Sequence, residues 1–410
     1  MKISNKILVN ISLFFTMTTF AIAYTVASPM LIEISQRLGI GVGEMGYSFS
    51  SYFVGFIAGS LISSFFTRKS NRRFSLIFFN FLIMVSVFFL TFMFNFYLVL
   101  ILFLFIGISG GFIESQVSFL MIELNRKSEG LFMNLSQVFF GVGAFAGPFL
   151  FIITMKTGID WKYAFIISAG ICLINFVYLL FIDISAIEGD ADNKSQAEIK
   201  KTSGKVNLKL ISETRDTTSG KVIFLLSILV IFFYVSAESG ISIWVPTFLR
   251  MNKSFSEILS GEILSFFWLA TVMGRILIGF LSKKIRILNI LIFEVLASIL
   301  FVILGIYLKN NGFIIMSFVL SGLFLSGIWP LIVTYSGLKH PRSENFAISF
   351  IVLAGGVGGL ASPYLLGRII SMVNIFVAMN FIYVFLFFVF VFIVAIFLIE
   401  KKKFVRVKRI

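Results

Sequence analysis

The sequence predicts an all-α membrane protein in which twelve transmembrane helices form two pseudo-symmetric six-helix bundles. Two observations lead to this fold class: an unusually apolar composition, and a long-range repeat that relates the two halves of the chain. Hydrophobic residues make up 59% of the 410 residues and charged residues 13%. Soluble domains hold about 45–50% apolar and about 25% charged residues, so a water-soluble fold is excluded.

The repeat has one fixed offset of 215 residues. The segment 141–150 reads GVGAFAGPFL, and the segment 356–365 reads GVGGLASPYL. The same offset carries Gly59 onto Gly274 and the basic pair Arg68-Lys69 onto Lys283-Lys284. Two separated matches in one register indicate duplicated halves. This architecture is typical of secondary transporters, whose solute site lies between the halves near the bilayer midplane.

The first half, residues 1–184, contains six apolar runs. About 20 apolar residues cross the ~30 Å hydrocarbon core as a helix, and the backbone there must satisfy its own hydrogen bonds. The predicted spans are 8–32, 45–66, 74–94, 97–122, 131–155 and 163–182. The segment 185–220 follows. It is rich in Glu, Asp, Lys, Ser and Thr, so we expect a flexible or weakly helical cytoplasmic linker without a core of its own.

The second half, residues 221–400, repeats the pattern and is followed by a basic tail, 401–410. The predicted spans are 222–249, 258–281, 287–308, 313–338, 346–370 and 375–399.

Lysine and arginine predict the orientation. With both termini in the cytoplasm, the loops on the other side hold only Arg37, Lys156, Lys162, Arg250, Lys253 and Lys309, as the positive-inside rule requires. The net charge of +15 then reflects topology and attraction to the anionic cytoplasmic leaflet. We expect a monomeric multi-pass protein of the inner (cytoplasmic) membrane. Its expected partners are lipids and a small solute, and nucleic acid is not one of them.

Signatures of enzymatic chemistry are lacking. The chain has one cysteine, Cys172, within a span, and one histidine, His340, in a loop. No HExxH, Walker or paired-cysteine pattern occurs. We therefore predict no enzyme activity, no catalytic residue, no metal site and no cofactor other than a coupling ion, H⁺ or Na⁺.

Four glutamates lie within apolar spans: Glu114, Glu238, Glu262 and Glu294. A charge at mid-membrane costs roughly 2.5–3.5 kcal/mol on insertion scales, so each needs a partner, a wet cavity or a proton. Glu294 and Arg275 lie about as far from the turn at Lys283-Lys284 as each other, which favours a gating or structural ion pair between them over contact with a substrate. Glu262 lies near the outer end of its span, where an aqueous vestibule accounts for it.

Glu114 and Glu238 lie deeper and have polar neighbours. Tyr234 shares the helical face of Glu238 at i−4. A carboxyl group in apolar surroundings is harder to ionise, so it can take up and release a proton as a cavity alternates its opening. We predict coupling or ligand-binding roles for both glutamates. The alternative is a neutral carboxylic acid that only forms a hydrogen bond across helices.

Further side chains are predicted to line the same cavity. Amide and hydroxyl groups bind polyols, and an indole face packs on the apolar side of a sugar ring. The offset of 215 also places Trp329 opposite Glu114 across the pseudo-symmetry. The predicted lining residues are Tyr24, Asn134, Gln137, Tyr234, Trp268 and Trp329.

With these features the chain resembles the major facilitator superfamily over its whole length. The resemblance rests on the two halves, the central loop, the basic turns after spans two and eight, and Trp161 at the start of span six. It implies the fold of that superfamily and rocker-switch alternating access. The superfamily's basic turn motif is altered, because Arg68 and Lys283 stand where its aspartates belong.

Within the superfamily, the segment Tyr234-Val235-Ser236-Ala237-Glu238 is similar to the Tyr-Val-Gly-Ala-Glu segment of the fucose/proton symporter group and its glucose-transporting relatives. Glu114 falls where that group carries an acid in its fourth helix. Span one, however, has no acid before Glu33, whereas the fucose symporter has an aspartate there. The resemblance implies a sugar transporter without assigning fucose.

The sequence therefore predicts an H⁺- or Na⁺-coupled transporter of a sugar or similar small polar solute. Two alternatives stay open: a proton-coupled antiporter that exports drugs or other apolar or cationic compounds, and a non-transporting receptor or scaffold that uses the central loop.

Overall fold

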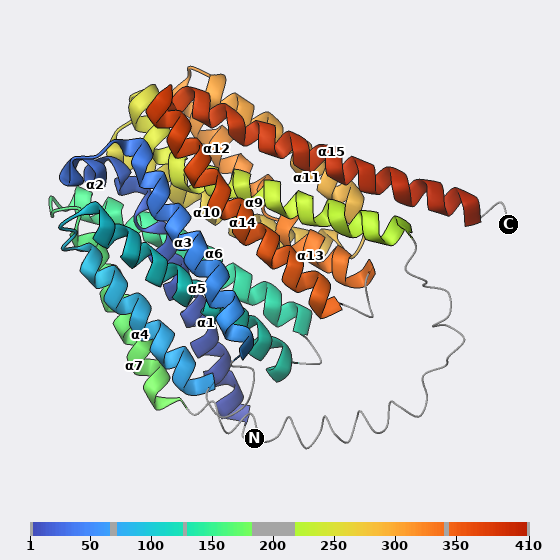
Figure 1. Cartoon of the computed structure of the whole chain (residues 1–410), viewed down its shortest axis with the longest axis horizontal. Helices are drawn as coiled ribbons and strands as arrows, with labels where there is room; N and C mark the ends of the chain where they lie inside the picture. The colour runs from blue at the N-terminus through green and yellow to red at the C-terminus, as the bar shows by residue number, and fades with distance from the viewer. Residues whose placement is uncertain (1–2, 66–71, 126–128, 183–217, 340–343, 408–410) are drawn as a thin grey trace.

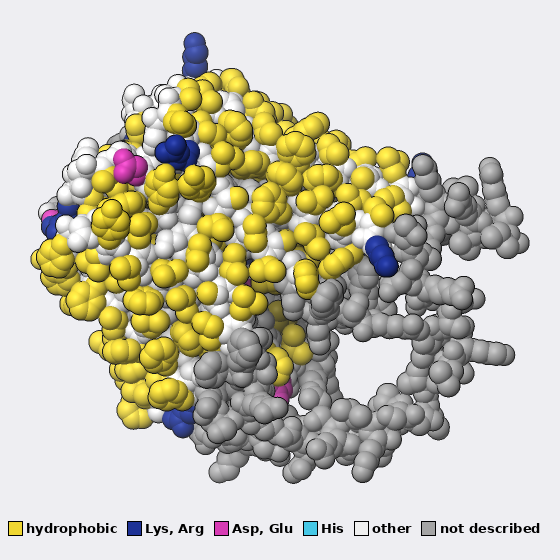
Figure 2. Space-filling view, viewed as in Figure 1, with side chains coloured by type: hydrophobic (Ala, Val, Ile, Leu, Met, Phe, Trp, Pro, Cys, Tyr) yellow, Lys and Arg dark blue, Asp and Glu magenta, His cyan; other side chains and the backbone are white. Residues whose placement is uncertain are grey.

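The computed structural model describes residues 3–65, 72–125, 129–182, 218–339 and 344–407. Within these ranges every regular element is a helix, and twelve helical segments are long and apolar enough to cross a membrane. Figure 2 shows hydrophobic side chains covering most of the visible face, with few charged groups among them. The predicted all-α fold with twelve transmembrane helices is confirmed, and the chain is a multi-pass membrane protein.

The N-terminal half is built from six spans. They are α1 (Ile3–Thr25) with η1 (Ser28–Met30) and α2 (Leu31–Leu38), α3 (Met45–Phe65) after η2 (Val42–Glu44), α4 (Arg72–Leu90), α5 (Phe96–Leu124), α6 (Glu129–Lys156) and α7 (Tyr163–Phe181).

The C-terminal half repeats this order. It consists of α9 (Thr218–Lys253), α10 (Glu257–Leu281), α11 (Ile287–Tyr307), α12 (Asn311–Leu325) with α13 (Ile328–Lys339), α14 (Glu344–Met372) and α15 (Ile375–Val407). Helix α15 continues through residues that were predicted as a separate tail, since lysine and arginine are good helix formers. The predicted linker lies almost wholly outside the described residues, so its flexibility stays a prediction.

Equivalent helices make equivalent contacts. In the first half α3 packs on α5, α1 on α6 and α4 on α7, and in the second half α10 packs on α12, α9 on α14 and α11 on α15. The halves meet through α3 against α14 and α6 against α10, which are again related by the repeat. At one equivalent pair, a Cβ on Gly59 would collide with the backbone of Ile108, and a Cβ on Gly274 with that of Leu323. Glycine at these positions allows the helix backbones to touch.

Two spans are interrupted. Pro29 lacks the N–H that would continue α1, and the chain passes through η1 before α2 begins. Span ten breaks at Ser326 and Gly327, between α12 and α13. Pro330 cannot donate to the carbonyl of Ser326, so one helical bond is lost at this break.

The halves touch at one end and separate toward the other. Figure 1 shows them side by side near α2 and splayed toward the ends of the chain. The contacts near α2 include the Ser50 hydroxyl, which donates to the Leu360 carbonyl at 3.0 Å, and ion pairs of 2.7 Å from Arg250 to Glu33 and from Lys156 to Glu262. The structure is therefore closed on the α2 side and open on the side where α1 begins.

Candidate functional site

A cavity lies between the halves. Helices α1, α3, α5 and α6 contribute one wall, and α9, α10, α13 and α14 the other. Six of the residues predicted from the sequence line it together: Tyr24, Glu114, Gln137, Glu238, Trp268 and Trp329. Spans far apart in the sequence thus converge on one site, at the interface where transporters of this architecture bind their solutes.

The repeat relates the two walls residue by residue. The offset of 215 carries Tyr24 onto Ser239, Phe53 onto Trp268 and Glu114 onto Trp329, and all six line the cavity. It also carries Phe20 onto Val235. The pseudo-two-fold axis therefore passes through the cavity, and the two halves present unlike side chains across it. A guest in this cavity meets an asymmetric surface built on a symmetric frame.

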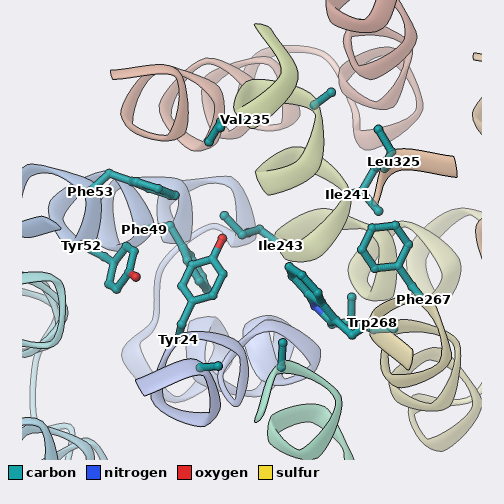
Figure 3. Close-up of a cluster of buried hydrophobic side chains, with 14 of the residues drawn as sticks. Tyr24, Phe49, Tyr52, Phe53, Val235, Ile241, Ile243, Phe267, Trp268 and Leu325 are labelled. Atoms are coloured by element: carbon teal, nitrogen blue, oxygen red, sulfur yellow. The ribbon is translucent and has the colours of Figure 1, made fainter. Parts of the chain in front are cut away.

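Half of the residues that line the cavity are aromatic. The rings of Tyr24 and Tyr52 stack with centroids 4.9 Å apart, and Phe53 meets Tyr52 edge-on at 5.0 Å. Figure 3 shows this cluster on α1 and α3, with Trp268 reaching toward it from α10. The Trp268 ring is 1% exposed, and its Nε1 has no hydrogen-bond partner.

Each of the two glutamates in the cavity accepts a hydrogen bond from one uncharged side chain. Gln137 Nε2 donates to Glu114 Oε1 at 2.9 Å, and the Tyr234 hydroxyl donates to Glu238 Oε1 at 2.6 Å. Tyr234 itself is buried behind Glu238 and does not belong to the lining. Its part in the site is to hold the carboxylate, as its place one helical turn earlier allows.

Arg275 was predicted to pair with Glu294, and this prediction is wrong. Arg275 lines the cavity and donates from Nη1 to the main-chain oxygen of Gln137 at 2.8 Å, while Glu294 accepts a hydrogen bond from the Gly327 N–H. Similar distances from the hairpin turn predict a similar depth in the membrane for the two side chains, but not the direction in which each points around its helix axis. Arg275 is the one cation among the lining residues that the structure describes, beside two carboxyl groups.

Asn134 was also predicted to line the cavity, and it does not. Its side chain is exposed and does not belong to the described lining. It precedes Gln137 by three residues, so it lies nearly one turn closer to the end of α6 at which the halves separate. Glu262 is accounted for by its pairing with Lys156 at 2.7 Å, which joins the two halves on the α2 side.

Sequence reasoning missed the phenylalanines and one tyrosine of the lining. Phe53, Phe56, Phe140 and Tyr52 all reach the cavity. The 54 phenylalanines of the chain are spread over every span, so composition could not single them out. The repeat held a usable signal for Phe53, because this residue is the equivalent of Trp268.

Two six-helix bundles with a partly polar cavity between them are the architecture of a membrane transporter. A family model described as Major Facilitator Superfamily matches residues 13–311, and the chain belongs to that superfamily. It is a transporter and not an enzyme, and the predicted resemblance is confirmed.

The known proteins that it resembles include several transporters. The glucose/mannose transporter GlcP of Bacillus subtilis is 24% identical over 373 residues, covering 90% of this chain and 88% of that protein. A TsgA homolog of Buchnera aphidicola is 23% identical over 358 residues, 87% of this chain and 86% of the relative. Among solved structures, a D-xylose-proton symporter superposes with a TM-score of 0.75 at 13% identity, covering 96% of this chain and 97% of that one. The nucleoside transporter NupG superposes with a TM-score of 0.70 at 12% identity, covering 96% and 99%.

Proposed function

We propose that this protein carries a sugar, or a similar small polar solute, across the cytoplasmic membrane by alternating access coupled to H⁺ or Na⁺. The main observation behind the proposal is that indole rings, carboxyl groups and an amide group line one cavity. Trp268 and Trp329 offer flat apolar surfaces, and Glu114, Gln137 and Glu238 offer hydrogen-bonding groups beside them. Sugars present apolar ring faces and hydroxyl edges, which suit these two kinds of surface.

The full-length relationship to a glucose/mannose transporter supports the same solute class. The glutamates support coupling, because a carboxyl group within an apolar span is costly unless it binds a proton or a cation. Arg275 compensates one of the two carboxylates, so the empty cavity holds one excess negative charge when both are ionised. Uptake of one monovalent cation, H⁺ or Na⁺, would neutralise it.

The orientation is part of the proposal. If both termini are cytoplasmic, as the distribution of lysine and arginine favours, the cavity in this structure opens to the cytoplasm. The ion pairs from Arg250 to Glu33 and from Lys156 to Glu262 would then close the outer side.

The test is uptake into proteoliposomes made with the purified protein. Radiolabelled glucose, mannose, xylose, a nucleoside and a lipophilic cation are compared under an imposed pH gradient, an imposed Na⁺ gradient and no gradient. We expect gradient-driven accumulation of at least one sugar, and competition for it by related sugars. Glu44→Gln is the matched control for a glutamate-to-glutamine change within the cavity, because Glu44 lies outside the cavity and caps its own helical turn.

A second candidate is export of apolar cations. The observation in its favour is the aromatic character of the wall, in which Phe20, Phe53, Phe56 and Phe140 lie close to two acids. Efflux of the lipophilic cation against a pH gradient, with no sugar flux, would favour this candidate and overturn the sugar proposal. Absence of flux for the whole panel would favour a non-transporting receptor.

A further inference from the structure

The carboxyl group of Glu294 lies outside the central cavity, and only one of its two oxygens has a hydrogen-bond partner. The residue is 1% exposed. Its Oε1 accepts a hydrogen bond of 3.1 Å from the Gly327 N–H at the break between α12 and α13, and its Oε2 has no hydrogen-bond partner. Among the described residues, no lysine or arginine lies within ion-pair distance of it. Such an acid is expensive within a bilayer and marks a functional site unless it is compensated.

A second hollow leads to this carboxyl group, between α10, α11 and the end of α12. Glu294 is the one ionisable group among its described lining residues, and Asn289 is the only other polar side chain. The rim is formed by apolar side chains that stay exposed: Leu277 at 53%, Leu281 at 42% and Phe293 at 61%. The hollow is thus an apolar groove with one acid buried in it.

The groove faces the lipid and not the central cavity. Helix α10 presents Trp268 and Arg275 to the cavity, and it presents Leu277 and Leu281 to the groove. Leu277 follows Arg275 by two residues, which is about 200° around the helix axis at 3.6 residues per turn. A guest in the groove would therefore come from the bilayer and would not compete directly with a solute in the cavity.

We propose that this groove is a lateral binding site for a lipid-soluble amine, with its protonated nitrogen on the free oxygen of Glu294 and its hydrocarbon chain along Leu277, Leu281 and Phe293. An ammonium group supplies both the missing hydrogen bond and the missing positive charge, whereas an alcohol supplies only the hydrogen bond. The exposed apolar rim suits a hydrocarbon chain on the bilayer side. This site is independent of the proposed solute and of its coupling ion.

The experiment uses a thiol placed at the groove. Asn289 is exposed, lines the groove and lies two residues after the start of α11. An Asn289→Cys variant is made in a Cys172→Ala background, which removes the buried native thiol, and is reconstituted in nanodiscs. The rate of its reaction with a maleimide is measured against increasing dodecylamine. Dodecanol is the uncharged probe of equal chain length, and Met372→Cys, exposed at the other end of the molecule, is the control thiol.

We expect dodecylamine to slow labelling at position 289 at least fivefold, and dodecanol to slow it less than twofold. Glu294→Gln should raise the dodecylamine concentration needed for half-protection at least tenfold. Leu277→Trp fills the groove and leaves the acid in place, and it should also abolish protection. This second variant keeps the proposal testable if Glu294→Gln does not fold. Equal protection by amine and alcohol, equal slowing at position 372, or undiminished protection after Glu294→Gln would overturn the proposal.

Discussion

Arg275 of α10 reaches across the boundary between the two halves and donates a 2.8 Å hydrogen bond to the main-chain oxygen of Gln137 in α6. The side chain of the same glutamine donates to Glu114 at 2.9 Å. A cation of the C-terminal half is thereby connected, through one residue, to an acid of the N-terminal half. A rocking motion that separates α6 from α10 would break this connection, so the charge state of the cavity and the position of the halves are linked.

Removing this cation should impair transport. Arg275→Gln leaves Glu114 and Glu238 without their nearby positive charge and removes the contact to Gln137, and hydrogen bonds from charged groups contribute about 1.5–3 kcal/mol. We expect the initial rate of solute uptake into proteoliposomes to fall at least tenfold, and Arg275→Lys to retain more of it. Arg368→Gln is the matched control, because Arg368 is exposed on α14 and outside the cavity lining. Equal losses in the two glutamine variants would remove Arg275 from the mechanism.

Glu114→Gln should separate exchange from accumulation. The amide keeps the size of the side chain and an oxygen that can accept from Gln137, but it cannot release a proton. We therefore expect solute counterflow, which needs no net ion movement, to stay within about threefold of the native rate. Accumulation driven by an ion gradient should disappear. A variant that still concentrates solute under the gradient would exclude Glu114 as the coupling group.

Two ion pairs on the α2 side should differ in their importance for closure. The side chains of Arg250 and Glu33 are 15% and 13% exposed, and those of Lys156 and Glu262 are 56% and 27% exposed. Solvated pairs contribute about 0–1 kcal/mol, whereas breaking a desolvated pair at an interface costs about 2–5 kcal/mol. Arg250→Ala should therefore shift the protein toward the state that is open on this side, and Lys156→Ala should do so much less.

A thiol placed where the two halves touch on the α2 side measures this shift. Ser50 is 7% exposed and contacts Leu360 across the interface. We expect Ser50→Cys, in a Cys172→Ala background, to react with a membrane-impermeant maleimide at least fivefold faster after Arg250→Ala. Labelling rates in the Arg250→Ala and Lys156→Ala proteins that both equal the rate of Ser50→Cys alone would show that neither pair controls closure.

The sequence was informative where its own repeat supplied the geometry. The offset of 215 relates Glu114 to Trp329 and predicts that both reach one cavity, as they do. The sequence was misleading where a similar depth of two residues in the membrane was taken to mean that their side chains face each other. Arg275 and Glu294 lie at similar depth, yet one faces the central cavity and the other the groove behind α10. Helix packing decides direction, and an unbroken apolar span contains little periodic signal from which to read it.

The interruption of span ten is a second case in which the sequence does not reveal which residues of other helices make contact. Pro330 indicates a weak point in the helix, but the group that accepts a hydrogen bond from the buried N–H of Gly327 is Glu294, on another helix. A Cβ on Gly327 would lie 2.5 Å and 2.6 Å from the two oxygens of the Glu294 carboxyl group. A larger residue at this position would therefore have to displace the Glu294 carboxyl group.

Gly327→Ala should consequently destabilise the protein. The added methyl group pushes the carboxyl group away from the Gly327 N–H, and an unsatisfied buried polar group costs about 1–3 kcal/mol. We expect the thermal unfolding midpoint of the purified protein to fall by several degrees. In Gly279→Ala, a Cβ meets no atom within 4 Å, and alanine is a better helix former than glycine by about 1 kcal/mol, so this control should unfold at the native temperature or slightly above it. Combining Gly327→Ala with Glu294→Ala creates room for the methyl group and should recover part of the loss. If the double variant unfolds no later than Gly327→Ala alone, the Glu294 carboxyl group is not what makes glycine necessary at the break.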